Sequence, residues 1–485
     1  MVASKPKFIN ALKEICGADM ITDVARLKVY ETDGLTAKKR LPWIVVLPSN
    51  IEQVQIIVAL CAEHSVPIVA RGAGTGLSGG AMPHDQGVLL SLAKFNRVLE
   101  INADARYARV EPGVTNLGIS QAVDHLGLYY APDPSSQIAC SIGGNVAENS
   151  GGVHCLKYGL TVHNVMKLRI VSPAGELYEL GSDALDSAGL DLMALMHGSE
   201  GMLGIVVEVT VKLLEKPPCV CVVLGAFDSA EAAGRCVAEI IGNGILPAGL
   251  EMMDQMAVRA AEAFVHAGYP TEAAALLLAE LDGTEAEVAQ QHKDLMSMMQ
   301  KCGAGEISTA WDAEDRARLW QGRKAAFPAV GRLAPDYYCM DGTIPRRELA
   351  DVLTAIADLS KQYALPVANV FHAGDGNLHP LILYDANDGD QLERAEAFGG
   401  KILELCIAKG GTITGEHGVG VEKIDQMCIQ FTPEELTMFH GVKSSFDSQG
   451  ILNPGKAIPT LSRCAEFGAM HVHVGDEKHP ALERF

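Results

Sequence analysis

The sequence predicts an α+β protein with two main domains, the second of which is built on an antiparallel sheet. Two observations predict this fold class. Short strand-like segments alternate with helix-like segments along most of the 485 residues, and Pro217-Pro218 interrupts a β-branched segment near mid-chain, as expected at a domain boundary. We therefore expect four parts: a helical lead-in (1–37), a first domain (38–217), a second domain (218–420) and a C-terminal helical segment that returns to the first domain (421–485).

The first domain is expected to begin with a strand, a helix and a second strand. Ile44–Leu47 and Pro67–Ala70 are short apolar runs typical of strands. Ile51–Glu63 between them has the apolar spacing of an amphipathic helix. A further helix and further strands are predicted at Thr115–Leu126 and at Val88–Leu92, Tyr107–Glu111, Lys167–Val171 and Ile205–Leu214.

In the second domain, strand and helix patterns alternate after the Pro-Pro pair. Strands are predicted at Cys219–Phe227, Ala274–Glu280, Leu365–Phe371 and Leu378–Leu383. Helices are predicted near 229–241, 284–301, 312–326, 346–362 and 391–409, and after a glycine-rich stretch at Pro433–Ser448. This order is typical of a separate α+β domain.

Composition narrows the class of protein. The chain carries 39 Lys+Arg against 60 Asp+Glu, a formal net charge of −21, which argues against non-specific nucleic-acid binding because phosphates repel a negative surface. No apolar run approaches the ~18 residues of a membrane-spanning helix, and the start lacks the apolar core of a signal peptide. The 12 cysteines are scattered along the chain, so we expect reduced thiols and a cytoplasmic protein.

The first glycine cluster predicts a phosphate-binding loop. Gly74, Gly76 and Gly79 have the G-x-G-x-x-G spacing of a dinucleotide site, but that loop must open a helix, and Pro83 and the strand from Val88 leave no room for one. We therefore expect a strand-to-strand loop whose backbone N–H groups bind phosphate; a glycine turn without ligand is the alternative. The cluster comprises Arg71, Gly72, Ala73, Gly74, Thr75, Gly76, Leu77, Ser78, Gly79 and Gly80.

A second cluster of small and polar residues runs from Ser141 to Gly152 and follows Pro132-Asp133-Pro134-Ser135-Ser136. Residues without bulky side chains let a flat ligand approach the backbone closely. By itself, this segment is equally compatible with an ordinary loop.

Histidines and one carboxylate suggest a metal site. If Asp375-Gly376 is the two-residue turn of a hairpin, His372 directly faces His379 on one side of the sheet, with Cβ atoms about 4.5–5.5 Å apart. Glu416, flanked by glycine in Gly415-Glu416-His417-Gly418, offers a third ligand. Two histidines, a glutamate and an open position suit catalytic Zn²⁺. The alternative is that each histidine is an ordinary core or surface residue.

The motifs RGAGTGLSGG, PDPSS, SIGGNVAENSGG, KYG and GSEGMLGI occur in this order. Together they resemble the FAD-binding domain of the vanillyl-alcohol oxidase/p-cresol methylhydroxylase (PCMH) superfamily. The resemblance implies a two-part PCMH-type FAD-binding domain in which residues 72–80 hold the pyrophosphate. It also implies that the remaining flavin is lined by Pro134, Ser135, Gly143, Gly144 and Ile205.

The second domain adds FHAGDGNLH and GEHGVG, followed by LNPGK and the tail RCAEFGAM at 463–470. These motifs resemble the FAD-linked D-2-hydroxy-acid dehydrogenases, including the flavin subunits of glycolate oxidases. The resemblance implies metal ligands His372, His379 and Glu416, a proton-abstracting base His417, a substrate contact Asn377, a flavin contact Asn453 and a carboxylate clamp Arg323.

This resemblance implies oxidation of a 2-hydroxy acid to a 2-oxo acid, with hydride transfer to non-covalently bound FAD. Relatives that act on dicarboxylates carry a lysine where this chain has Tyr337–Asp341, so we expect a short monocarboxylate, glycolate or D-lactate or both. The cysteine spacing of an iron–sulfur cluster is absent from the sequence. The electrons are therefore expected to pass to an iron–sulfur subunit and quinone, with a smaller FAD subunit alongside and at most peripheral membrane contact.

Two other functions compete with this interpretation. A non-catalytic FAD-binding subunit would keep the glycine clusters without the histidine and glutamate set, which this chain retains. An NAD-dependent dehydrogenase is disfavoured because no helix fits after Gly80.

Overall fold

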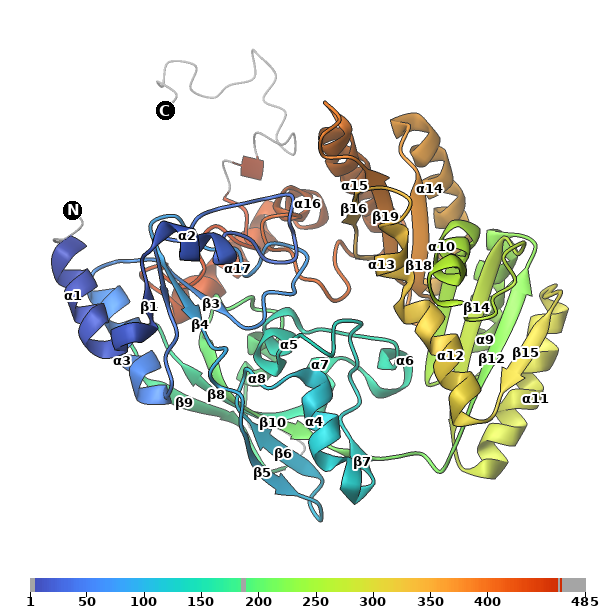
Figure 1. The fold of residues 1–485 in the computed structure, drawn as a ribbon, viewed down its shortest axis with the longest axis horizontal. Coiled ribbons are helices and arrows are strands. Elements are labelled where there is room, and N and C mark those ends of the chain that lie inside the picture. Colours follow the sequence, from blue (N-terminus) through green and yellow to red (C-terminus); the bar gives the residue numbers. More distant parts are fainter. Residues whose placement is uncertain (1–4, 185–188, 461–462, 465–485) are drawn as a thin grey trace.

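A computed structural model describes residues 5–184, 189–460 and 463–464. Helices and sheets alternate, and the second domain is built on an antiparallel sheet, so the predicted α+β class is confirmed. In Figure 1 the first domain (blue to green) lies beside the second domain (green to orange). Within the described ranges, no helix combines the length and the apolar composition that crossing a membrane requires. Most of the tail motif at 463–470 lies outside the described residues.

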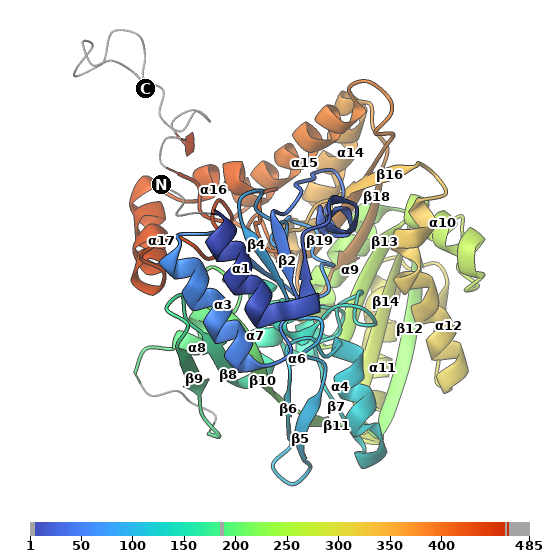
Figure 2. The same cartoon turned by 60° about the vertical axis from the view of Figure 1, so that its left-hand side comes forward.

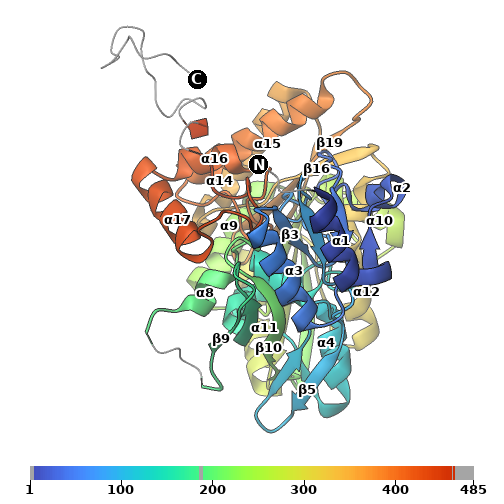
Figure 3. The ribbon, with the colours of Figure 1, turned by 90° about the vertical axis from the view of Figure 1, so that its left-hand side faces the viewer.

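The first sheet is formed by the start of the chain. Its strands and the helices around it are α1 (Lys5–Cys16), β1 (Met20–Ile21), α2 (Val24–Leu27), β2 (Ile44–Val46), α3 (Ile51–Glu63), β3 (Ile68–Arg71) and β4 (Val88–Ser91). The strand order is β1-β2-β4-β3, and both β2 and β3 run parallel to β4. Apolar residues at helical spacing on α3 are buried in the adjoining core: Val54, Ile57, Val58 and Cys61. α1 packs beside α3 on the outer surface (Figure 3).

The second sheet has five strands in the order β5-β6-β10-β8-β9, all antiparallel. Its strands are β5 (Val98–Asn102), β6 (Tyr107–Val110), β8 (Val165–Val171), β9 (Leu177–Gly181) and β10 (Ile205–Lys212). The accompanying helices and a two-stranded ribbon are α4 (Asn116–Val123), α5 (Ile142–Glu148), α6 (Cys155–Tyr158), α7 (Thr161–Asn164), α8 (Leu192–Met196), β7 (Leu128–Tyr129) and β11 (Leu214–Glu215).

The second domain contains an eight-stranded sheet in the order β15-β12-β14-β13-β18-β19-β16, with β17 also paired to β19. All of its pairings are antiparallel. The strands are β12 (Cys219–Phe227), β13 (Gly249–Asp254), β14 (Ala275–Gly283), β15 (Ile307–Ala310), β16 (Asp336–Cys339), β17 (Gly342–Thr343), β18 (Val367–His372) and β19 (Asn377–Tyr384).

Helices cover both faces of this sheet (Figure 2). They are α9 (Ala230–Gly242), α10 (Gln255–Val265), α11 (Glu285–Lys301), α12 (Ala313–Lys324), α13 (Ala326–Val330), α14 (Leu349–Tyr363) and α15 (Gln391–Ala408). Alternate strand residues enter two separate cores, as a strand's period of two requires: Leu277 packs with α9 and α11, whereas Leu276 and Leu278 pack with α10, α12 and α13.

The C-terminal segment returns to the first sheet. After α16 (Ile424–Gln430) and α17 (Pro433–Phe446), Leu452 pairs with Ile68 of β3. The Ile68 N–H donates to the Ile451 carbonyl at 2.8 Å, and the Asn453 N–H donates to the Ile68 carbonyl at 2.8 Å. Residues far apart in the sequence, Ile68 and 451–453, therefore lie side by side at this edge of the sheet.

Several elements differ from the prediction. The helix α5 occupies part of the second glycine cluster. Ser141 caps the start of this helix, since its side chain accepts a hydrogen bond from the Gly144 N–H. The central strand β13 was not predicted, since Gly249–Asp254 has no β-branched residue. The expectation of reduced thiols is wrong for Cys428 and Cys464, which form a disulfide with Cα atoms 5.2 Å apart. The other cysteines are free.

Candidate active site

A cavity of about 470 Å³ lies where the two domains meet. Both glycine clusters line it from the first domain, and His379, Glu416 and His417 line it from the second. Of the residues predicted to bind the cofactor, those on its wall are Arg71, Gly72, Ala73, Gly74, Thr75, Gly76, Leu77, Gly80, Pro134, Ser135, Gly143, Gly144 and Ile205. A cofactor held by the glycine clusters would thus adjoin the histidines.

The first cluster is a strand-to-strand loop, as predicted, and joins the parallel neighbours β3 and β4 without a helix. It contacts the second cluster directly, since a Cβ added at Gly72 would lie 2.0 Å from Ser141 Oγ. Only glycine fits this approach. The two clusters therefore form one continuous wall.

Three predicted cofactor residues lie outside the set that lines the cavity. Ser78 donates from Oγ to the His417 carbonyl at 2.8 Å, and Gly79 adopts φ +81°. Asn453 donates from Nδ2 to the carbonyls of Gly80 (2.9 Å) and Glu200 (2.6 Å). Ser78 and Asn453 thus hold the glycine loop against the second domain and the C-terminal segment.

His372, His379 and Glu416 converge, as the sequence predicts, on one point. Glu416 Oε1 lies 3.3 Å from His372 Nε2 and 3.0 Å from His379 Nε2. Both rings are buried, at 3% and 1% exposure, and neither His379 nitrogen has an aligned hydrogen-bond partner. Two imidazoles and a carboxylate that converge in this way, with one imidazole lacking an aligned partner, fit a divalent metal such as Zn²⁺.

The predicted register of the hairpin is wrong. His372 pairs with Asn377, and His379 pairs with Val370, so the two histidines are diagonal rather than opposite. The loop is longer than two residues because the N–H groups of Asp375 and Gly376 both bond back to the His372 carbonyl, and Gly376 adopts φ +82°. A two-residue offset preserves the sheet face, so both side chains still point the same way.

Behind His372 lies a buried chain of charges whose central member, Glu251, was missed by sequence analysis. His372 Nδ1 is 2.7 Å from Glu251 Oε1, and Arg323 Nε donates to Glu251 Oε2 at 2.8 Å. Arg323 Nη2 also lies 2.6 Å from Oε2, so two guanidinium nitrogens face the same carboxylate, and Arg323 is not among the residues that line the cavity. Burial alone would raise the pKa of Glu251, yet His372 and Arg323 hold it below its usual value.

A second buried carboxylate, Asp341, shapes the loop that carries Glu416 and His417. It accepts the backbone N–H of His417 at 2.8 Å and of Glu416 at 3.2 Å. Lys423 Nζ donates to it at 3.1 Å, and Lys423 keeps the pKa of Asp341 below its usual value although burial opposes this. Glu200 holds the next turn by accepting from the Val419 and Gly420 N–H groups at 2.7 and 2.8 Å.

His417 stands beside these candidate metal ligands on the cavity wall. Its ring stacks on His379 with centroids 4.9 Å apart, and its Nδ1 has no hydrogen-bond partner. Burial lowers the pKa of His417 to about 4, so the ring is neutral at neutral pH. Asn377 is buried behind this loop, where its amide fills the space beside Gly415.

Known families match both domains. The family described as "FAD binding domain" matches residues 42–181, and "FAD linked oxidases, C-terminal domain" matches residues 216–457. The solved structure of p-cresol methylhydroxylase with substrate bound superposes with a TM-score of 0.79 at 18% identity, covering 94% of this chain and 97% of that one. The fold and the cavity thus define a PCMH-type, FAD-binding flavoprotein.

Curated relatives narrow the class further. "Glycolate oxidase subunit GlcD" of Escherichia coli (strain K12) is 61% identical over 98% of this chain and 96% of its own length. The Bacillus subtilis protein of the same name is 40% identical over 88% and 91%, and a D-lactate dehydrogenase of Anaerostipes hadrus is 32% identical over 93% and 97%. The chain belongs to the FAD-linked oxidase family and is an FAD-dependent oxidoreductase.

Proposed function

We propose that this enzyme oxidises a short 2-hydroxy monocarboxylate, glycolate or D-lactate or both, to the 2-oxo acid. The observation that carries the proposal is the shared cavity: the glycine wall for FAD and the His372–His379–Glu416 centre border the same space. The relatives named for glycolate and D-lactate support the substrate class.

The side chains divide the work as follows. His372, His379 and Glu416 hold the divalent metal, and His417, neutral and on the cavity wall, accepts the proton of the substrate hydroxyl. When bound, the metal supplies Lewis-acid polarisation of that hydroxyl and FAD supplies the hydride acceptor. For the substrate carboxylate we propose Arg323, whose guanidinium is paired with Glu251 behind His372 in the structure and would have to exchange that partner for the substrate. Asn377, expected from the resemblance to contact the substrate, is buried beside Gly415 instead, and we propose that it positions the loop that carries Glu416 and His417.

The substrate preference rests on residues next to the metal centre. Cys339 and Met340, in the stretch where dicarboxylate-oxidising relatives carry lysine, are both buried and uncharged. A second carboxylate that reached this stretch would be desolvated without a cation from it, which is costly, although Lys324 lies elsewhere on the cavity wall. A short monocarboxylate avoids this cost.

The reduced flavin must pass its electrons on. The relatives named as glycolate oxidase subunits support transfer to a partner. We propose an iron–sulfur subunit that feeds quinone, with a smaller FAD subunit alongside. The protein would then be cytoplasmic and peripheral at the inner face of the membrane.

A dye-reduction panel tests the function. Purified enzyme is assayed with glycolate, D-lactate, L-lactate and 2-hydroxyglutarate. We expect turnover with glycolate or D-lactate, and little with the dicarboxylate. Comparable rates with 2-hydroxyglutarate would overturn the monocarboxylate assignment, and no reduction by any of these acids would overturn the activity.

The cofactor linkage is tested separately. Gly72–Gly80 contains no His, Cys or Tyr to which FAD could be attached, and the nearest candidates in the second cluster's continuation, His154, Cys155 and Tyr158, are not among the residues that line the cavity. We therefore propose non-covalent FAD. Acid precipitation should leave the yellow colour in the supernatant; a yellow pellet would contradict this.

A further inference from the structure

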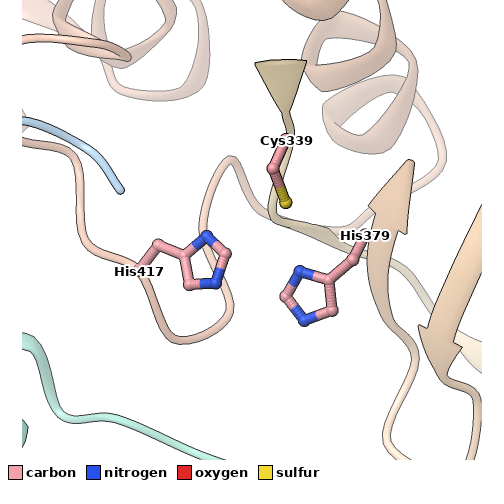
Figure 4. Close-up of side chains that lie close together, drawn as sticks. All are labelled: Cys339, His379 and His417. Atoms are coloured by element: carbon pink, nitrogen blue, oxygen red, sulfur yellow. The ribbon is translucent and has the colours of Figure 1, made fainter. Parts of the chain in front are cut away.

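A second set of potential metal ligands lies beside the first. Cys339, His379 and His417 each offer one ligand atom, and these atoms lie within 4.8 Å of one another. Figure 4 shows the Cys339 sulfur pointing between the two imidazole rings. Cys339 and His379 are buried at 7% and 1% exposure. This second set, which we call the thiol site, shares only His379 with the His372–His379–Glu416 centre.

The sheet register explains why the thiol site exists. Cys339 on β16 pairs with Leu381 on β19, and His379 lies two residues before Leu381, on the same face of that strand. His372 on β18 is diagonal to His379 from the other side. One face therefore presents a thiol, an imidazole and a second imidazole on three neighbouring strands, with His379 in the middle.

The atoms of the thiol site have few competing partners. The Cys339 sulfur makes one weak contact, to the Met340 carbonyl at 3.4 Å. His379 Nδ1 and His417 Nδ1 have no hydrogen-bond partner in the described structure, whereas His379 Nε2 faces Glu416 Oε1 at 3.0 Å. A tetrahedral ion with bonds of ~2.0–2.3 Å holds its ligand atoms roughly 3.3–3.8 Å apart. A contraction of about 1 Å would therefore suffice to close the thiol site around an ion.

We propose that the thiol site binds soft, thiophilic divalent cations such as Cd²⁺ and that this binding inactivates the enzyme. Thiolate ligands favour soft metals, whereas a set of two histidines and a glutamate lacks any sulfur ligand. Binding replaces the thiol S–H bond by an S–Cd bond and releases one proton to solvent, with no change of oxidation state. The bound Cd²⁺ then engages two side chains that the proposed reaction needs: His379, a ligand of the productive metal, and His417, the base.

The loss of activity rests on the proposed function, because it depends on the roles of His379 and His417. The binding of Cd²⁺ to the thiol site can be tested independently of that function. FAD-loaded, metal-depleted enzyme is given one equivalent of Cd²⁺ or Zn²⁺, and X-ray absorption spectroscopy reports the ligand atoms. We expect a sulfur shell around Cd²⁺, and around Zn²⁺ only nitrogen and oxygen at ~2.0–2.1 Å rather than sulfur at ~2.3 Å. A Cd²⁺ spectrum without sulfur would overturn the proposal.

Matched variants identify the sulfur. Cys339→Ser, nearly isosteric, should remove the sulfur shell from the Cd²⁺ spectrum, whereas Cys236→Ser, a buried thiol on α9, should retain it. A sulfur shell that persists in Cys339→Ser would refute the site.

The variant His372→Ala separates the two proposals. It should weaken Zn²⁺ binding, since it removes a ligand of the productive centre, but leave the Cd–S shell in place. Unchanged Zn²⁺ affinity would refute the productive metal centre alone. Loss of the Cd–S shell in this variant would overturn the separate thiol site.

Discussion

At the scale of single residues, the site depends on buried charges that orient the reactive side chains. Glu251 fixes which nitrogen of His372 faces Glu416, because its carboxylate accepts from Nδ1 and leaves Nε2 on the side of Glu416, where we propose a metal. Arg323 in turn holds Glu251. Neither Glu251 nor Arg323 is among the residues that line the cavity, and both stand behind the candidate metal ligand His372.

Glu251→Gln should therefore weaken metal binding. The amide keeps the size of the side chain but removes the charge that pairs with His372 and Arg323, and loss of such a supporting partner typically costs 10–100-fold in metal affinity. Competition with a chromophoric chelator measures the affinity. Glu285→Gln, at the exposed start of α11, is the control and should behave like the wild type; equal affinities of both variants would contradict the role of Glu251.

His417→Asn should separate proton transfer from metal binding. The variant removes the base and should lower the rate on the order of 10²–10⁴-fold, while metal and FAD contents stay at wild-type levels because His417 is outside the productive ligand set. Metal analysis alongside the kinetics checks this. Joint loss of metal and activity would make His417 a ligand instead.

The sequence was informative about these residues to different degrees. Motifs placed His372, His379 and Glu416 together, but the direct opposition of the histidines failed because the length of the turn depends on backbone hydrogen bonds that the Asp-Gly pair does not reveal. Glu251 gave no signal, since its partners Arg323 and His372 are 72 and 121 residues away. Long-range pairing of a single buried charge has no local pattern.

At the scale of elements, the loop 414–420 is held in shape by groups outside it. Asp341 organises its first half and Glu200 its second half. Sequence analysis noted the glycines that flank Glu416 and His417, and the irregular backbone there includes Gly418 at φ +79°. It could not show that the irregularity is fixed by two carboxylates from different domains.

Asp341→Asn should destabilise the protein. Lys423, fully buried, would lose its closest carboxylate, and breaking a buried ion pair from one side typically costs about 3–5 kcal/mol. Denaturant unfolding of holoenzyme measures the loss. The double variant Asp341→Asn with Lys423→Met removes both charges and should recover part of it; a single variant as stable as the wild type would refute the pairing.

At the scale of the whole molecule, charged contacts join the two domains beside the cavity. His154 of the first domain lies between Asp133, at 2.9 Å, and Glu280 of β14, also at 2.9 Å. Lys157 pairs with Asp282 on the same strand. Burial alone would lower the pKa of His154, but Asp133 and Glu280 raise it well above its usual value.

This bridge predicts a pH-dependent stability. The folded-state pKa of His154 exceeds its unfolded value of ~6.5. The protonated ring between Asp133 and Glu280 therefore stabilises the fold fully below pH ~6.5, and this stabilisation is lost as the pH rises through the folded-state pKa. The difference in Tm between wild type and His154→Gln should thus be largest at acidic pH and shrink at alkaline pH. His125→Gln, an exposed site, is the control; a difference independent of pH would contradict the bridge.

The return of the C-terminal segment to β3 also determines when, during synthesis on the ribosome, the contacts of the glycine loop can be completed. Gly80 receives hydrogen bonds from Asn453 and Lys456, at 2.9 and 3.1 Å, across more than three-quarters of the 485 residues. At ~5–20 residues per second, the ribosome finishes Gly80 within roughly 4–16 s but Lys456 only after roughly 23–91 s. For most of the time of synthesis, the loop 72–80 therefore lacks the hydrogen bonds that Asn453 and Lys456 donate to it. A chain truncated before residue 450 would contain every glycine of the loop but neither of these two donors.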